Sequence, residues 1–195
     1  MKKFLPLIFL AFLLNSCCKD HSDVIPGQNF IPDDILEEIR NNGQVIHEGF
    51  NPPKLKGKYL MSIQTLVSSN FPDAFTPGHT FVDLTLEFLN FNTNSLTLTV
   101  KIEEGGQLLV GGGKGSFISG EGNDFTIFVE NKAKDDSGHE LIQAEVYSGT
   151  LDANGIINLQ RSLFMINDNG DPAGKYIENG QGRLIIDGDG YSEKI

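Results

Sequence analysis

The sequence contains no tryptophan, and its two cysteines, Cys17 and Cys18, both lie near the N-terminus. Because no cysteine follows position 18, the rest of the chain has neither a disulfide framework nor a cysteine nucleophile. The lack of tryptophan disfavours sugar binding, since carbohydrate-binding platforms usually expose Trp or Tyr to stack on the sugar face. Phenylalanine is frequent instead, with 14 residues, most of which we expect in the core.

No apolar run is long enough to cross a bilayer as a helix, which takes about 20 residues. The longest run, residues 4–14, follows Lys2 and Lys3 and predicts a signal peptide over residues 1–16. The next residues, Leu14-Asn15-Ser16-Cys17, resemble the lipobox of bacterial lipoproteins. That resemblance implies cleavage before Cys17 and attachment of lipid to the Cys17 thiol.

The chain also lacks a block of basic residues, and its formal net charge is −11. Such a charge repels phosphate backbones, so we expect no nucleic-acid partner. It also disfavours adsorption to anionic lipid, which leaves the covalent lipid as the predicted membrane attachment. The stretch 19–23, Lys-Asp-His-Ser-Asp, resembles the acidic export tag of surface lipoproteins of Bacteroidota. We therefore expect a lipid-anchored protein of the outer membrane, with surface and periplasmic orientations both open.

Residues 17–30 contain Pro26 and Gly27 without apolar periodicity, which predicts a flexible lipidated tether. Residues 31–195 then have the length of one domain. This domain begins with a short helix predicted over 33–42, because Pro32 and two acidic residues precede an apolar stripe, and Gly43 is a helix stop.

From Gly57 onward, short runs of alternating apolar and polar residues are separated by Gly, Asn and Asp, which is typical of an all-β domain. The runs at 82–88 and 96–103 are the clearest, and the Asn-rich segment 90–94 between them predicts a hairpin. Further strands are expected at 59–67, 107–110, 116–119, 125–130, 140–147, 156–166 and 183–187.

These runs amount to about eight or nine strands. An antiparallel sheet of this size tends to close, because closure removes the exposed edges. We therefore predict an antiparallel up-and-down β-barrel of about 8 strands with a short N-terminal helix. A two-sheet β-sandwich is the alternative.

Gly57-Lys58-Tyr59, at the start of the first long strand, resembles the Gly-x-Trp signature of lipocalins and other calycins, with tyrosine in place of tryptophan. In that superfamily the aromatic ring closes the barrel floor, and an arginine near the last strand packs across it. The resemblance implies a calycin-like barrel in which Tyr59 and Arg183 form the closing pair. The chain also resembles a set of uncharacterised Bacteroidota lipoproteins with such barrels.

Several stretches contain residue types that occur in catalytic, phosphate-binding or metal sites. Gly111-Gly112-Gly113-Lys114-Gly115-Ser116 departs from the phosphate-binding loop, because Gly115 separates Lys114 from Ser116 and a strand follows. His47, His79 and His139 have no ligand spacing, and the acidic loops at 167–171 and 187–190 do not match the EF-hand order. No nucleophile elbow occurs. We therefore predict no enzyme, no cofactor and no metal site.

Two functions remain open at this point. The first is a lipid-anchored, non-enzymatic module that binds a small apolar ligand inside the barrel, as barrels of about eight strands have room for one. The second is a structural or interaction protein with a filled barrel, acting as an accessory subunit or inhibitor for an envelope protein partner. A pocket that joins a histidine to two carboxylates would revive an enzymatic reading.

Overall fold

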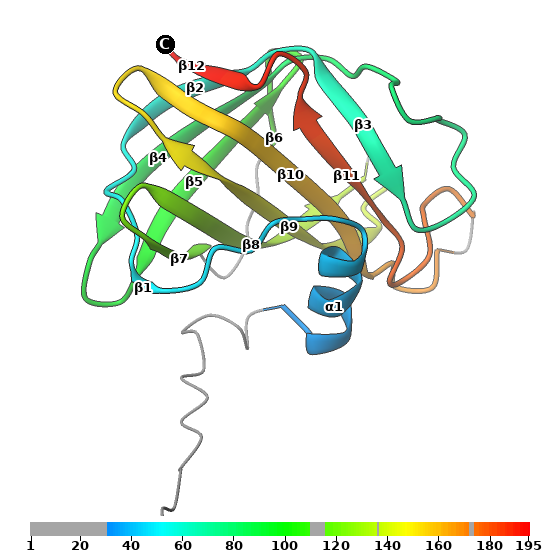
Figure 1. Ribbon diagram of the computed structural model, residues 1–195. Coiled ribbons are helices and arrows are strands. Elements are labelled where there is room, and N and C mark those ends of the chain that lie inside the picture. The colour runs from blue at the N-terminus through cyan, green and yellow to red at the C-terminus, as the bar shows by residue number, and fades with distance from the viewer. Residues whose placement is uncertain (1–30, 110–115, 136, 172–173) are drawn as a thin grey trace, which may run out of the picture.

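A computed structural model describes residues 31–109, 116–135, 137–171 and 174–195 (Figure 1). The predicted signal peptide, the tether with Cys17, and the glycine-rich segment 111–115 lie outside the described residues. The described elements are one helix and twelve strands. In chain order they are α1 (Asp33–Asn41), β1 (Phe50–Asn51), β2 (Gly57–Met61), β3 (Gln64–Ser69), β4 (Leu84–Asn92), β5 (Thr97–Glu104), β6 (Gln107–Leu109), β7 (Ser116–Glu121), β8 (Asp124–Lys134), β9 (Glu140–Leu151), β10 (Gly155–Asn167), β11 (Gly182–Asp187) and β12 (Tyr191–Lys194).

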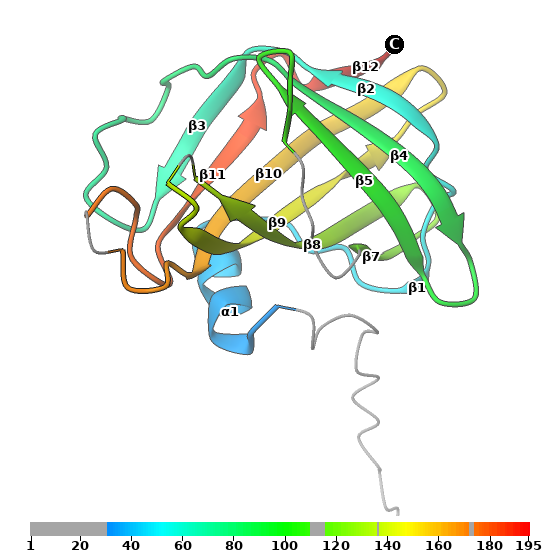
Figure 2. The ribbon, with the colours of Figure 1, turned by 180° about the vertical axis from the view of Figure 1, so that it is seen from behind.

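The strands close into an antiparallel barrel of 8 staves, as predicted, so the two-sheet sandwich is wrong. A stave here is one strand, or two short strands that follow each other along the barrel wall. Strands β2 and β3 together form the first stave, and β11 and β12 together form the last, with β12 pairing β2 and β11 pairing β3. Strands β6 and β7 pair with opposite ends of β5 and share one stave. Strands β4 and β5 stand opposite β9 and β10 across the barrel (Figure 1, Figure 2).

Alternation of apolar and polar side chains explains how each strand faces the interior. In β4, Leu84, Leu86 and Phe88 are fully buried, whereas Thr85 and Glu87 between them are half-buried on the outer face. The strand register places the inner face of β2 beside that of β4, because Tyr59 of β2 lies opposite Leu86. The apolar face of the predicted 82–88 run is thus confirmed as the inner face from Leu84 onward.

The first stave differs from the single strand predicted over 59–67, because it breaks at Ile63. This residue has φ +54°, a left-handed conformation that is unfavourable for a β-branched side chain. The break faces a second break between β11 and β12, where the Gly188 amide donates a hydrogen bond to the Ile63 carbonyl at 3.1 Å. The two kinks therefore match, and the short strand β12, which the sequence did not predict, continues the last stave.

An N-terminal arm, residues 31–51, covers part of the barrel's outer face and includes α1. The helix is one residue shorter than predicted and buries Ile35, Leu36 and Ile39. Beyond it, the Gln44 amide donates to the Ser148 hydroxyl at 2.6 Å, and β1 pairs in parallel with β7. The arm explains why several outward-facing side chains of the barrel are as buried as those of the interior. None of the described helices is long and apolar enough to cross a bilayer.

Candidate functional site

The barrel interior is filled with apolar side chains at the end where β2 begins. Five inner-face residues there are at most 2% exposed: Tyr59, Leu86, Phe88, Phe125 and Ile127. The rings of Tyr59 and Phe88 lie 5.6 Å apart between centroids. A cavity wide enough for water would leave its walls accessible, so this half of the barrel has no room for a ligand beside these side chains.

A buried ionic cluster crosses the middle of the barrel. The Arg161 guanidinium, on β10, reaches β5 on the opposite wall, where its Nη1 donates to Glu104 Oε1 at 2.9 Å. The same nitrogen donates to Gln64 Oε1 at 3.1 Å, and Nη2 pairs with Glu145 Oε2 at 3.2 Å. The side chains of Arg161 and Glu145 are 3% and 1% exposed. Through these contacts Arg161 connects β10 to β3, β5 and β9 inside the barrel.

Two further side chains complete the surroundings of Glu145. The Tyr147 hydroxyl donates to its Oε2, and the Asn131 amide donates to its Oε1 at 3.1 Å. Burial, followed by the nearby charge of Glu145, raises the pKa of Tyr147 well above its ordinary value, so the phenol stays protonated at neutral pH. Among the described residues, Asn131 Oδ1 is buried without a hydrogen-bond partner.

The predicted closing pair of Tyr59 and Arg183 is wrong in its partners. Arg183 pairs with Asp73 of the β3–β4 loop, its Nη2 donating to Oδ1 at 2.9 Å. Its guanidinium carbon also lies over the rings of Phe71 and Phe75, at 5.3 and 5.4 Å from their centroids. The hydrogen bond from Arg183 lowers the pKa of Asp73 well below its ordinary range. Arg183 therefore fixes a loop at one end of the barrel rather than plugging the floor.

Tyr59 does sit at the floor, but a different cation lies over its ring. Lys194 of β12 places Nζ 5.8 Å from the ring centroid, and its register position is directly opposite Tyr59. The Tyr59 hydroxyl donates to the Lys56 carbonyl at 3.2 Å. A lysine from the last stave thus takes the place that the calycin resemblance assigned to an arginine.

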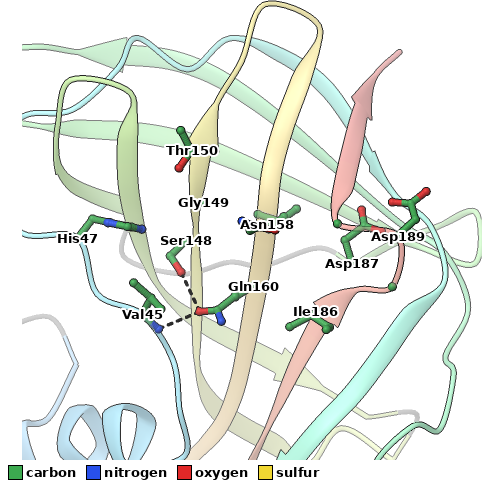
Figure 3. Close-up of a pocket in the computed structure, with 13 residues that line it drawn as sticks. Val45, His47, Ser148, Gly149, Thr150, Asn158, Gln160, Ile186, Asp187 and Asp189 are labelled. Carbon is green, nitrogen blue, oxygen red and sulfur yellow. Dashed lines mark hydrogen bonds between the residues drawn. The ribbon is translucent and has the colours of Figure 1, made fainter.

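A groove of about 590 Å³ lies on the outer face of the barrel, between the N-terminal arm and the kink that joins β11 to β12 (Figure 3). We call it the arm groove. Strands β9 and β10 form its floor. Its lining residues are Val45, His47, Ser148, Gly149, Thr150, Asn158, Leu159, Gln160, Ile186, Asp187, Gly188, Asp189 and Gly190.

The Gln160 amide is held in a fixed orientation in the arm groove. Its Oε1 accepts hydrogen bonds from the Val45 backbone amide at 2.8 Å and from the Ser148 hydroxyl at 3.4 Å. Because the oxygen faces the arm, the amide nitrogen faces away from it, toward Ile186 on the opposite wall (Figure 3). Gln44, buried behind the groove, holds Ser148 in turn. The arm thereby positions a hydrogen-bond donor over the floor.

Other polar side chains surround this donor. The His47 backbone amide donates to Thr126 Oγ1 at 2.7 Å, which fixes the residue, while its imidazole forms no hydrogen bond to the described residues. Asn158 has φ +52° at the bulge in β10, which places its amide at the groove. On the far wall, Asp189 is exposed. The neighbouring Asp187 is buried, and burial raises its pKa.

The Ser148 hydroxyl is buried and engaged with Gln44 and Gln160, so it is not a free nucleophile beside His47. In the part of the chain that the structure describes, no three His, Cys, Asp or Glu side chains are grouped as a metal ion requires. The groove presents directed hydrogen-bond donors and acceptors around a floor formed by two strands.

The sequence did not indicate the arm groove, because its lining comes from four separate segments with no shared motif. Of the histidines weighed from the sequence, only His47 lies in it. His79 stacks on Phe75 at 4.3 Å between centroids, and His139 contacts the Asp168 carbonyl at 2.6 Å. The one local signal is the pair of glycines flanking Asp189, in the acidic loop 187–190 that does not match the EF-hand order.

Comparison of the chain with known protein families, with curated proteins and with solved structures finds no match.

Proposed function

We propose that this protein is a lipid-anchored, non-enzymatic binding module of the cell envelope, in which the barrel is a filled scaffold and the ligand lies in the arm groove. The observation that carries this proposal is the Gln160 amide, whose oxygen is engaged by Val45 and Ser148 and whose nitrogen is directed into a groove of about 590 Å³. A volume of this size is within the usual range for small-molecule sites, about 300–1,000 Å³.

The lining indicates the class of ligand. Its acidic residues are Asp189, which is exposed, and Asp187, whose pKa is raised by burial, and the lining contains no lysine or arginine. An anionic ligand would therefore be disfavoured, whereas a neutral or cationic one is compatible with the charge. Amide, imidazole and carboxylate groups in one groove favour a small polar molecule with both hydrogen-bond donors and acceptors.

The small apolar ligand predicted inside the barrel stays a prediction. The filled half around Phe88 leaves it no space, so it would have to lie at the other end, where Leu163 and Arg183 are partly accessible. The polar cluster around Arg161 forms the inner boundary of that region, and burying it under an apolar ligand would be unfavourable. An envelope protein partner, seated on the outer face, is the alternative that the filled interior supports.

The membrane anchor is proposed from the sequence alone. The predicted tether, residues 17–30, connects the lipidated Cys17 to the N-terminal arm, so the arm groove would be held near the outer membrane. Intact-mass measurement of the protein from its own host should show a mass above that of residues 17–195 by diacylglycerol and acyl additions. Replacement Cys17→Ser should remove these additions and release the protein from the membrane fraction.

The binding proposal is tested by native mass spectrometry of the full chain purified gently from its own host. The wild type should carry a small-molecule adduct. Val45, which is 46% exposed on the groove wall, is replaced by tryptophan to fill the groove. Val67, which is 38% exposed on β3 and outside the groove, receives the same substitution as the matched control.

We expect the adduct to be lost in Val45→Trp and retained in Val67→Trp, with equal urea midpoints for the two variants. An adduct that persists in Val45→Trp would place the ligand elsewhere and overturn the assignment to the arm groove. A wild type without any adduct would refute the binding function and favour a protein partner.

A further inference from the structure

A second groove, of about 550 Å³, lies at the closed end of the barrel, apart from the arm groove. We call it the lysine groove. It is formed where the segment that leads into β2 passes the end of β4, and a bulge in β4 near Asn90 shapes one side. Its lining residues are Lys54, Leu55, Lys56, Leu89, Asn90, Phe91 and Thr93.

The lysine groove is positively charged in a protein of net charge −11. Lys54 and Lys56 are both exposed, and neither forms an ion pair with the residues that the structure describes. In contrast, Lys58, two positions further along, pairs with Glu103 at 3.4 Å. No carboxylate is among the lining residues, so two exposed lysines border one groove without an acidic side chain in its lining.

The remaining lining supplies apolar surface. Leu55, between the two lysines, is 1% exposed and anchors the segment in the core. Leu89 and Phe91 are only partly buried, and Phe91 packs on the core with one side while the other borders the groove. Charge and apolar surface therefore occur side by side in one cavity.

We propose that the lysine groove binds an anionic amphiphile, a molecule with a carboxylate or phosphate head and an alkyl chain. The head lies between the ammonium groups of Lys54 and Lys56, which have no other partner. The chain lies along Leu89 and Phe91, which the head alone would leave exposed to water. This site is independent of the arm groove, whose acidic lining selects against the same ligand.

The test uses the full chain and sodium dodecanoate below its micelle concentration, followed by isothermal titration calorimetry. Saturable binding with one site is expected. The double variant Lys54→Gln/Lys56→Gln should weaken the affinity about tenfold at low salt, since two partly exposed ion pairs are removed. Lys132→Gln, an exposed lysine on β8 outside the groove, is the matched control and should leave the affinity unchanged.

Three comparisons separate the sources of such a ligand. Dodecan-1-ol should bind at least tenfold more weakly than dodecanoate because it has no charge, and inorganic phosphate alone should bind weakly because it has no chain. Vesicles of phosphatidylglycerol test a membrane surface in place of a free molecule. Binding to vesicles without binding to dodecanoate would overturn the proposal, as would equal affinities for dodecanoate in the double variant and the wild type.

Discussion

Removing the cation at the centre of the barrel should have a large effect on stability. Replacement Arg161→Met keeps much of the side-chain volume but leaves Glu145, 1% exposed, with only the hydroxyl of Tyr147 and the amide of Asn131 as partners. It also removes the donor to Glu104 on the opposite wall. Breaking a buried ion pair by removing one partner costs about 3–5 kcal/mol, because the other charge stays buried.

An exposed ion pair on the same barrel provides the control. Lys101 Nζ lies 3.1 Å from Glu87 Oε2, with the two side chains 49% and 25% exposed. Because solvent screens this pair, Lys101→Met should lower the free energy of unfolding by less than about 1 kcal/mol. Both variants are compared with the wild type by urea unfolding at pH 7, monitored by far-ultraviolet circular dichroism.

The double variant Arg161→Met/Glu145→Leu distinguishes the buried charge from the loss of packing. It removes the orphaned carboxylate, so it should recover part of the stability lost in Arg161→Met. If Arg161→Met costs no more than Lys101→Met, the interior is wet enough to screen the cluster. The conclusion that the barrel is a filled scaffold would then fail.

Three other predictions follow from local geometry. The Arg183 hydrogen bond lowers the pKa of Asp73 well below its unfolded value of about 3.9. The resulting stabilisation is complete above that value and is lost only as the pH falls through the lower folded pKa. Asp73→Asn should therefore cost about 2 kcal/mol at pH 7 in urea unfolding, and most of this cost should remain at pH 3. Loss of the whole cost by pH 3 would contradict this prediction. Gly120→Ala should lower the free energy of unfolding by at least about 3 kcal/mol, because a Cβ there would lie 2.0 Å from the Asp124 carbonyl oxygen. Gly122→Ala is the control: a Cβ there meets open space, so only its φ of +65° is unfavourable, and the cost in urea unfolding should be about 1 kcal/mol. Ile63→Asn should relieve the left-handed conformation and raise the free energy of unfolding by about 1 kcal/mol. A lower free energy of unfolding would show that the exposed isoleucine is stabilising.

The barrel could be predicted because its information is local. Leu84, Leu86 and Phe88 alternate with polar residues, and turn residues separate the strands, so strand number and inward faces follow from period-two patterning. The breaks in the first and last staves could not be predicted in this way. Ile63 is typical of a strand, and its left-handed conformation depends on a contact with Gly188, far away in the sequence.

The ionic cluster had a signal in the sequence that the strand assignment did not use. Glu145 and Tyr147 alternate in the predicted strand 140–147, and Arg161 lies inside the predicted strand 156–166. Once the inner face is known, the register shows that these residues share it, because Tyr147 lies opposite Arg161. The sequence alone could not show that Glu104 completes the cluster, since that contact crosses the barrel.

The pairing of Tyr59 with Arg183 was wrong for a related reason. Family resemblance placed an arginine near the last strand, but the last stave contains both β11 and β12, and the residue opposite Tyr59 is Lys194. The sequence contains even less local indication of the arm groove. Its walls meet only because Gln44 and Val45 of the arm bond to the outer face of β9 and β10.

The most direct test of the central claim, that the barrel interior is filled and the ligand lies outside it, is a crystal structure under xenon pressure. Xenon occupies dry apolar cavities in proteins. We expect no xenon among the inner-face side chains of Tyr59, Phe88, Phe125 and Tyr147. Xenon bound among these rings would reveal an internal apolar cavity, contradict the filled scaffold and favour the apolar ligand that the sequence predicted inside the barrel.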